Sequence, residues 1–392
     1  MVHKESGKWF VLGVLFTVRT VLAFHFQSLG SLAPFVQREL NISYAQIGIA
    51  IGIFMLPGIL FAIPGGLIGQ RFGDKRIAGG GLLLMIIGGV LQAAASSFPA
   101  LVFAQAVTGV GAVAINILLA KMVTDWFAQS SLALAMSLFV SSWPVGIALS
   151  LVTLPAFAEL TSIWHAFMLN VLLGSISLGL FLTLYRPPAD QGPQVGTFRF
   201  RLSGYEWTQS ALAGGAWSFY NVGFILVLSF GPAFLSEKGL SPATAALLIS
   251  VATWSVLITL PLGSTFARVI GSQDTVMIGC FLLLALTIAG LAFGLSPLFA
   301  CVLMGLLVGL PAGLIMALPA GVLAPNNRAA GMGIYYTFYY VGMSGLVAVA
   351  GVIGEYMGDA SGPLIFGSAM MLLASASLIG FRTVQRHHGA VT

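Results

Sequence analysis

The stretch Gly66-Leu-Ile-Gly-Gln-Arg-Phe-Gly-Asp-Lys-Arg76 is a short, basic, glycine-punctuated turn between two long apolar runs. Its basic side chains, Arg71, Lys75 and Arg76, fall within one loop. Short loops rich in Lys and Arg stay on the cytoplasmic side of a membrane. The turn therefore fixes the expected orientation of the chain, and every later apolar run alternates from it. Its spaced glycines would let two helix ends come close and turn tightly.

The composition is that of an integral membrane protein. The 392 residues are 58% hydrophobic and only 7% charged, whereas a soluble chain carries about 25% charged residues. The formal net charge of +5 is shared among short loops, with no basic tract, so we expect no nucleic-acid partner. Cys280 and Cys301 both sit in apolar runs and are expected to be buried hydrophobes rather than a disulfide or a metal pair.

The apolar runs predict an all-α fold with about twelve transmembrane helices, each near the roughly 20 residues that cross a bilayer. The first run is read as a retained span, because no small-residue cleavage site follows it. The expected spans are Trp9–Phe35, Tyr44–Ile68, Ile77–Ser97, Ala100–Val123, Leu132–Leu154, Trp164–Tyr185, Thr208–Leu235, Ala243–Phe266, Thr275–Leu295, Pro297–Val322, Gly331–Gly354 and Gly362–Phe381.

The distribution of Lys and Arg predicts that both termini are cytoplasmic. In that orientation Arg38 and Lys238 are outside, while Arg19 and Lys121 lie within spans. The expected location is the cell inner (plasma) membrane, with a multi-pass chain in contact with the lipid bilayer. The cytoplasmic set comprises Lys4, Lys8, Arg71, Lys75, Arg76, Arg186, Arg199, Arg201, Arg268, Arg328, Arg382 and Arg386.

A proline-containing loop over residues 186–207 divides the chain into two halves. We expect an N-terminal six-helix bundle over 1–185, a cytoplasmic linker over 186–207, and a C-terminal six-helix bundle over 208–392. Two such halves are typical of a transporter built from parallel repeats. A weak echo of the basic turn, with Gly263, Arg268 and Gly271, stands at the corresponding place in the second half.

The Gly66–Arg76 turn resembles the signature loop between spans two and three of the major facilitator superfamily, and the spans and central loop extend that resemblance over the whole chain. The resemblance implies two pseudo-symmetric bundles that rock about a central site and expose it alternately to each side. Spans one, four, seven and ten would line the cavity. The expected residues of conformational gating are Gly66, Gln70, Arg71, Gly73, Arg76 and Asp125.

This chain departs from the family pattern at several positions. The family usually has an acid where Gln70 stands, and Asp125 is a candidate substitute partner for Arg71 or Arg76. Proton-coupled members often place an arginine where this chain has Gln105. The first span with its arginine and the segment Ser142-Trp-Pro-Val-Gly146 look more like the cyanate-permease and organic-anion branches.

Arg19 is the leading candidate for substrate binding. It lies about ten residues into the first span, roughly 15 Å deep, which is near mid-membrane. Intramembrane ionisable residues are functional by default, although a structural arginine bonded to backbone carbonyls is the alternative. All eleven acids lie in loops or at span ends, unless a misplaced boundary lets Glu355 or Asp125 reach inward. A positive centre without an internal counter-ion favours an anionic ligand.

Two further ionisable groups have more ordinary interpretations. His25 could carry a proton, since its unperturbed pKa is near 6.5, but a histidine that is bonded to a neighbouring helix or faces the outer vestibule is the simpler interpretation. Lys121 and Asp125 are four residues apart and are expected to pair on one helix face, with a second anion contact by Lys121 as the alternative.

A set of polar aromatic side chains recurs at similar depth in other spans. These residues lie about 9–13 positions into their spans, too deep for an interfacial belt. Helix packing explains any one of them, but as a set they suggest indole and hydroxyl donors for a carboxylate or a similar anion. The set is Trp143, Trp217, Tyr220, Asn221, Trp254, Tyr335, Tyr336, Tyr339 and Tyr340. The substrate-binding residues expected from it are Trp143, Trp217, Tyr220, Asn221, Trp254, Tyr335 and Tyr339.

The sequence thus predicts a secondary transporter of a small anionic solute, by proton symport or anion exchange. The alternatives are an exporter of hydrophobic or cationic compounds, and a membrane sensor or scaffold that does not transport. No enzyme constellation, metal-ligand spacing or P-loop is present in the sequence, so we expect neither an enzyme nor a cofactor. The partners expected are the solute, protons and lipid, with the chain acting as a monomer.

Overall fold

The computed structural model describes residues 2–61, 73–127, 131–188, 202–324 and 327–391. Within those ranges every regular element is a helix, and twelve helices are long and apolar enough to cross a membrane. The predicted all-α membrane fold with about twelve spans is therefore confirmed.

The first half contains eight of the described helices. Its spans run up and down because each connection is short, so neighbours along the chain are antiparallel. The helices are α1 (Val2–Ser31), α2 (Ala33–Leu40), α3 (Tyr44–Ile53), α4 (Pro57–Phe61), α6 (Asp74–Ala93), α7 (Phe98–Phe127), α8 (Leu132–Leu160) and α9 (Ile163–Leu184).

The second half repeats the up-and-down order. Its first helix begins at Gly204, so the last four residues of the expected 186–207 linker are helical. The helices are α10 (Gly204–Glu237), α11 (Pro242–Thr259), η1 (Leu260–Leu262), α12 (Gly263–Ile270), α13 (Gln273–Ala292), α14 (Pro297–Ala317), η2 (Pro319–Gly321), α15 (Arg328–Met357) and α16 (Ser361–Val391).

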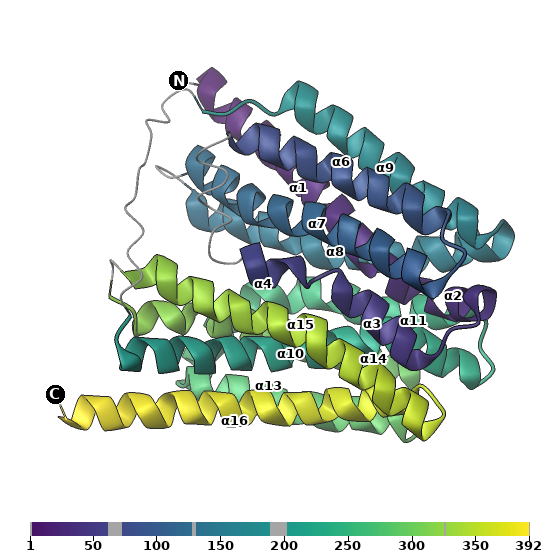
Figure 1. The fold of residues 1–392 in the computed structure, drawn as a ribbon. Coiled ribbons are helices and arrows are strands. Elements are labelled where there is room, and N and C mark those ends of the chain that lie inside the picture. Colours follow the sequence, from purple (N-terminus) through teal and green to yellow (C-terminus); the bar gives the residue numbers. More distant parts are fainter. Residues whose placement is uncertain (1, 62–72, 128–130, 189–201, 325–326, 392) are drawn as a thin grey trace.

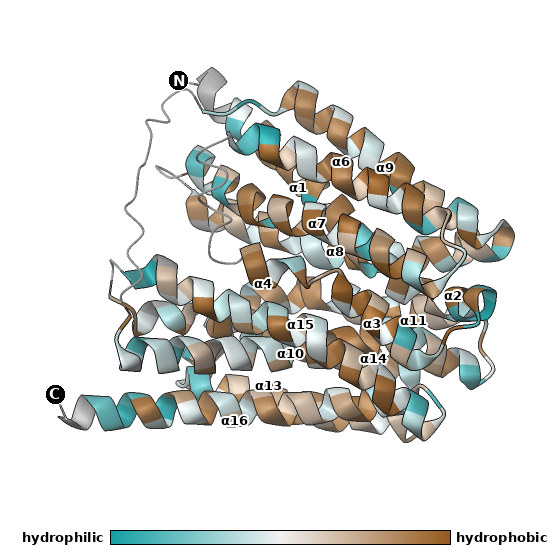
Figure 2. Cartoon of the chain, viewed as in Figure 1, coloured by the Kyte–Doolittle hydropathy of each residue, from teal (hydrophilic) through white to brown (hydrophobic). Residues whose placement is uncertain are grey.

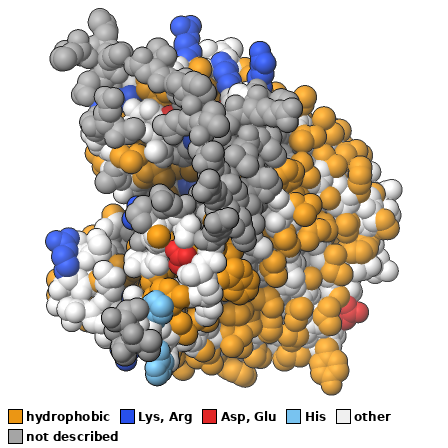
Figure 3. Space-filling view, turned by 60° about the vertical axis from the view of Figure 1, so that its left-hand side comes forward, with side chains coloured by type: hydrophobic (Ala, Val, Ile, Leu, Met, Phe, Trp, Pro, Cys, Tyr) orange, Lys and Arg blue, Asp and Glu red, His pale blue; other side chains and the backbone are white. Residues whose placement is uncertain are grey.

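Both chain ends lie at the same end of the molecule, which we call the terminal end (Figure 1). The opposite end, where α1 gives way to α2 and α15 to α16, is the distal end. Figure 2 shows long hydrophobic stretches along the helices and hydrophilic residues mainly near their ends. A wide hydrophobic surface covers the right-hand side of Figure 3, while Lys and Arg side chains project at its top and left. This is the surface that a lipid bilayer requires.

Local sequence signals set the helix ends. Ser43 accepts a hydrogen bond from the backbone of Gln46, whose side chain in turn accepts from the backbone of Ser43. Ser203 and Glu206 form the same reciprocal cap at the start of α10. Each such cap stabilises a helix by about 1 kcal/mol. Gly358 ends α15 at a φ of 77°, a left-handed conformation that favours glycine.

The two halves are fastened together at the distal end. Ser43 Oγ donates to Glu355 at 2.7 Å, and the Tyr44 hydroxyl donates to Glu237. A matching contact runs the other way, since the backbone N–H of Ala243 donates to Glu159 at 2.9 Å. In each case a carboxylate from one half meets the first residues of a span in the other half.

Close helix packing accompanies these hydrogen bonds, with α3 lying along α15 and α8 along α11. A Cβ built on Gly52 would lie 2.2 Å from the backbone oxygen of Ser344, and one on Gly48 would lie 2.7 Å from that of Val347. Only glycine lets the backbones of α3 and α15 come this close. The distal end is therefore closed.

The halves separate toward the terminal end. Figure 1 shows α1 and α6 above and α10 and α16 below diverging on the side of the two chain ends, and Figure 3 shows the surface hollowed there at the left. Among the described residues, the hydrogen bond between the halves that lies nearest to this end joins Asn116 and Tyr340. The molecule is thus held in a state that is closed distally.

Candidate functional site

Two helices of the first half hold the guanidinium of Arg19. Its Nη1 donates to the backbone oxygen of Phe139 on α8 at 2.9 Å, and its Nε donates to Oδ1 of Asn116 on α7 at 3.4 Å. The guanidinium carbon also lies 4.6 Å from the ring centroid of Phe139 and 5.5 Å from that of Trp143. A cation over an aromatic face gains about 0.5–2 kcal/mol. Each of these partners is neutral, so none of them cancels the positive charge.

The described part of the chain supplies no counter-ion for Arg19. The ion pairs among the described residues join Lys121 to Asp74 and to Asp125, and Arg382 to Asp274. Arg19 nevertheless keeps part of its surface exposed, whereas Val18 and Leu22 beside it on α1 are buried. The charge is therefore held at mid-helix between α1, α7 and α8 and remains partly accessible.

The second half faces Arg19 with tyrosines. Tyr336, Tyr339 and Tyr340, all on α15, lie close enough to Arg19 to interact with it electrostatically. Tyr340 is also hydrogen-bonded to the side chain of Asn116. The site is therefore built between the two halves: the first contributes a cation, and the second contributes hydroxyl groups. Tyr336 and Tyr340 belong to the predicted aromatic set without being expected binding residues, and they too lie near the charge.

Further aromatic rings pack next to the tyrosines of α15. The Trp217 ring lies 5.7 Å from that of Tyr220, 6.4 Å from that of Tyr335 and 6.2 Å from that of Tyr339. Tyr220 and Tyr335 are buried, and the Tyr220 hydroxyl donates to the backbone oxygen of Val308. Trp217 and Tyr339 remain partly exposed. Trp217 and Tyr339 therefore present the accessible rings of this group, and the buried rings of Tyr220 and Tyr335 pack against Trp217.

Two members of the predicted set take other places. Trp254 on α11 is 39% exposed, and no described ring packs on it, so the structure does not gather it with the others. Asn221 donates to the backbone oxygen of Trp217 at 2.7 Å within α10. It is partly exposed beside Trp217, with its amide group already engaged by its own helix.

His25 is buried inside the first half and does not border the site. Its Nε2 is 2.9 Å from the backbone oxygen of Asn170 on α9, which makes Nε2 the donor. A Cβ on Gly174 would lie 3.4 Å from that same nitrogen, so the ring fills the space between helices. This geometry matches the histidine bonded to a neighbouring helix.

A small network of charged side chains lies at the terminal end of the first half, and the sequence predicted only one of its pairs. Lys121 pairs with Asp125, as expected from their spacing, and also with Asp74 at the start of α6. Lys75 donates to the backbone oxygens of Leu182 and Tyr185 at 2.8 and 2.6 Å. The network ties the start of α6 to the ends of α7 and α9.

Burial is the largest cause that raises the pKa of the Tyr185 hydroxyl beside this network, and the charges of Asp74 and Asp125 raise it further.

Of the expected gating residues, Gly73 precedes α6 at a φ of 86°. Gly66, Gln70 and Arg71 lie outside the described residues, and so does any pairing of Arg71 with Asp125.

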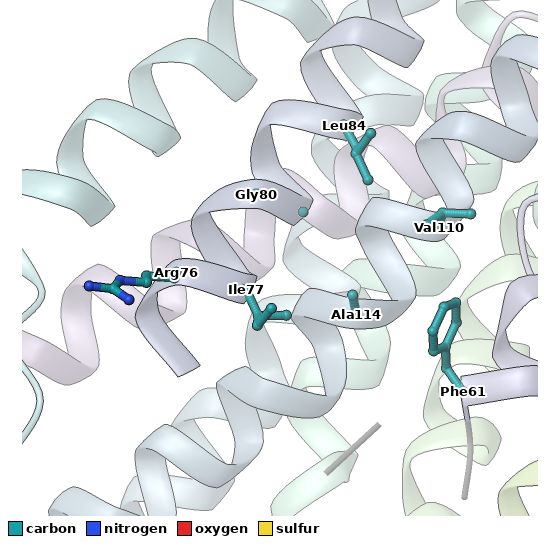
Figure 4. A pocket seen from close by; sticks show the side chains of 8 residues that line it. Phe61, Arg76, Ile77, Gly80, Leu84, Val110 and Ala114 are labelled. Atoms are coloured by element: carbon teal, nitrogen blue, oxygen red, sulfur yellow. The ribbon is translucent and has the colours of Figure 1, made fainter. Parts of the chain in front are cut away.

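The pocket in Figure 4 is a different place. It has a volume of about 320 Å³ and lies against α4, α6 and α7. Apart from Arg76, whose side chain points away from the labelled apolar group, its lining is apolar or glycine. Neither Arg19 nor any of the site's aromatic residues lines it. It lacks the convergent polar groups that mark a solute site.

Comparisons with known proteins agree with this architecture. The model of the Major Facilitator Superfamily matches residues 15–346. The chain is 26% identical to the 3-(3-hydroxy-phenyl)propionate transporter of Escherichia coli K12 over 95% of each chain. It is 23% identical to the hexuronate transporter of Bacillus subtilis 168 over 90% of each. The match to the E. coli inner membrane transport protein YajR, at 28% identity, covers 45% of this chain and only 38% of that protein.

A solved structure, that of the nucleoside transporter NupG in a mutant form, superimposes with a TM-score of 0.72 over 96% of this chain and 99% of that one. Its sequence identity is 15%, so the likeness concerns the fold alone. The family model spans most of the chain and the fold agrees with it: the chain belongs to the Major Facilitator Superfamily.

Proposed function

We propose that this transporter moves a small organic anion through the space beside Arg19, by alternating access. The observation that carries the proposal is the state of Arg19, which is deep in the protein, partly exposed and bonded only to neutral groups in the described structure. A charge at mid-membrane costs about 2.5–3.5 kcal/mol on insertion scales. A bound carboxylate would offset that cost by supplying the missing negative charge.

The wall opposite Arg19 supports an organic anion. Tyr336 and Tyr339 offer hydroxyl groups near the charge, and Trp217 offers an aromatic face farther away. Such a wall suits a carboxylate that carries an apolar or hydroxylated body. Two relatives that match over at least 90% of their length are named as transporters of organic acids, one of hexuronate and one of 3-(3-hydroxy-phenyl)propionate.

We infer that both termini are cytoplasmic, from the excess of Lys and Arg in the loops of the terminal end. In that orientation the structure, which is closed distally, opens toward the cytoplasm. The measurement is labelling of Gln194→Cys in the linker with a membrane-impermeant maleimide. We expect labelling only after the cells are opened, and labelling of intact cells would reverse the assigned orientation.

The same arrangement bears on how transport of the anion is coupled to a proton or to a second anion. No carboxylate in the described part of the site is available to carry a proton. A proton therefore travels on the anion, or the transporter exchanges one anion for another. His25 remains the candidate proton site of the protein itself, but its burial away from Arg19 favours the other two routes.

The experiment is a thermal-shift screen of the purified chain with 3-phenylpropionate, benzoate, glucuronate, sulfate and nitrate, followed by uptake of the hits into liposomes. An anion at 100 times its Kd should stabilise the protein by about 2.7 kcal/mol. Arg19→Ala should weaken binding of the best anion by about 2–5 kcal/mol. Arg19→Lys should bind weakly, because it keeps the charge and loses the planar fork.

Arg38→Ala is the matched control, since Arg38 is exposed on α2 at the distal end. We expect it to keep affinity within about twofold, as surface charges contribute little. Unchanged affinity in folded Arg19→Ala would make Arg19 a structural residue that bridges helices. Preference for a cation would instead favour an exporter, and binding of anions without uptake would favour a sensor.

A further inference from the structure

Asn116 stands between the cation of one half and a tyrosine of the other. Its Oδ1 accepts from Nε of Arg19 at 3.4 Å, and its side chain is also hydrogen-bonded to Tyr340. The acceptor atom faces Arg19, which leaves the Nδ2 donor for the Tyr340 hydroxyl. A carboxamide has both a donor and an acceptor, whereas a carboxylate has acceptors only. The position therefore uses both ends of an asparagine.

We propose that Asn116 preserves the charge selectivity that Arg19 gives the site, because its neutral amide orients the Arg19 guanidinium without cancelling the charge. This inference rests on the proposed function, in which an anion binds at Arg19. It names the residue whose neutral side chain leaves the Arg19 charge available to an anion.

The remaining donors of Arg19 show where the anion would be held. A guanidinium has five N–H groups, and Nε and Nη1 each use one of theirs on Asn116 and Phe139. Nη2 makes no hydrogen bond to any described residue. The edge formed by Nη1 and Nη2 therefore remains available for two parallel bonds to a carboxylate. Asn116 and Phe139 fix the orientation of that edge.

Aspartate at position 116 would have nearly the same size and the opposite effect. Its carboxylate would pair with Nε of Arg19 over the 3.4 Å that now separates the amide oxygen from that nitrogen. Arg19 would then have an internal counter-ion, and an incoming anion would meet a fixed negative charge beside its site. The uncharged form of the same solute would not be repelled.

The experiment compares Asn116→Asp with Asn116→Ala in the purified full-length protein. The probes are two pairs of nearly the same shape in which a neutral carboxamide replaces the carboxylate, 3-phenylpropionate with 3-phenylpropionamide and glucuronate with glucuronamide. At pH 8 we expect Asn116→Asp to weaken binding of the carboxylate at least thirtyfold and binding of the amide less than threefold. Asn116→Ala should weaken both probes by a similar factor of about three to ten, since it removes support for Arg19 without changing the charge.

The order of the two variants separates charge selectivity from simple support. If Asn116 only props up neighbouring helices, Asn116→Ala, which removes more contacts, should weaken the carboxylate at least as much as Asn116→Asp does. That order would overturn the proposal, and so would equal loss of both probes in Asn116→Asp.

Thr124→Asp is the control for an added charge. Thr124 lies on the same helix, two turns nearer the terminal end, with an exposed side chain. The substitution Thr124→Asp should change the affinity for the carboxylate by less than threefold. If Asn116→Asp does not fold, the carboxylate-to-amide preference of Asn116→Ala decides, because collapse of that preference would contradict a selectivity set by the Arg19 charge.

The proposed function can fail separately. If neither carboxylate binds the unsubstituted protein, or if Arg19→Ala binds them as well as the parent does, the anion site itself is wrong and this inference falls with it. If Arg19→Ala abolishes binding while Asn116→Asp leaves carboxylate affinity unchanged, only the role of Asn116 is wrong.

Discussion

The two ends of the interface between the halves are built differently. At the distal end, carboxylates of one half bond to the first residues of spans in the other, and glycines bring α3 and α15 into backbone contact. At the terminal end, the described network of Lys121, Asp74 and Asp125 stays within the first half. In the described part of the chain, hydrogen bonds join the two halves at the distal end, whereas the ion pairs of this network at the terminal end join helices of the first half.

The difference teaches where the work of conformational change lies. Opening the distal end must break hydrogen bonds and separate closely packed backbones, whereas closing the terminal end must create new contacts between the halves. An anion bound between Arg19 and α15, as proposed, would contact both halves, and it would shift the balance between these states only through contacts that differ between them.

The largest expected effect comes from Gly52→Leu, which strikes the backbone contact at the distal end. Its Cβ would overlap the Ser344 oxygen, and such overpacking costs about 1–3 kcal/mol, a shift of roughly 5- to 150-fold between states. Ser229→Cys, buried opposite Gly30 at this end, should then react faster with an impermeant maleimide. Gly345→Leu is the control, because a Cβ there meets nothing within 4 Å. Equal labelling in the two variants would show that the close contact does not hold the end shut.

A smaller effect is expected from Gly73→Leu at the terminal end. The φ of 86° is a conformation that non-glycine residues adopt only with strain of about 1–3 kcal/mol. Because this turn lies far from Arg19, the change should slow liposome transport several-fold and leave equilibrium anion affinity within a few-fold. Gly80→Leu on the same helix, where a Cβ also meets open space, controls for added bulk. Lost binding in folded Gly73→Leu would place the turn in the site rather than in the gate.

The smallest effect is expected from Glu159→Gln combined with Glu355→Gln. Each change weakens one hydrogen bond between the halves that is partly exposed to water, worth about 0.5–1.5 kcal/mol. Labelling of Ser229→Cys should rise severalfold in the double variant and by less in either single one. Asp359→Asn is the matched control: hydrogen bonds from Ser361 lower the pKa of Asp359, so it is ionised, and its bonds stay within the second half. A response to Asp359→Asn as strong as that to the double variant would mean that general surface charge, not the cross-half bonds, matters.

The spans could be predicted from the sequence because hydropathy and length need no knowledge of neighbours. The expected depth of Arg19 followed in the same way, and the salt bridges of the described residues join other side chains. Depth does not give the face of a helix, which is why Trp254 was grouped with rings that it does not meet.

Other residues were missed because their partners are distant in the sequence. Asn116 is an uncharged polar residue in an apolar run, and its importance appears only once α1 and α15 are placed beside α7. The pairing of Asp74 with Lys121 joins residues 47 positions apart. The sequence does show that Asn116 is the one amide side chain in the apolar stretch Ala112–Leu119. It does not show which residues that amide contacts.

The position of Arg19 in the first helix has a consequence for biosynthesis. The backbone oxygen that receives its hydrogen bond belongs to a residue 120 positions later in the chain. At about 5–20 residues per second, that acceptor leaves the ribosome roughly 6–24 seconds after the arginine. During this interval the first helix carries a charge that lipid does not accommodate. We therefore expect α1 to remain beside the insertion machinery, or at the bilayer edge, until α7 and α8 arrive to receive it.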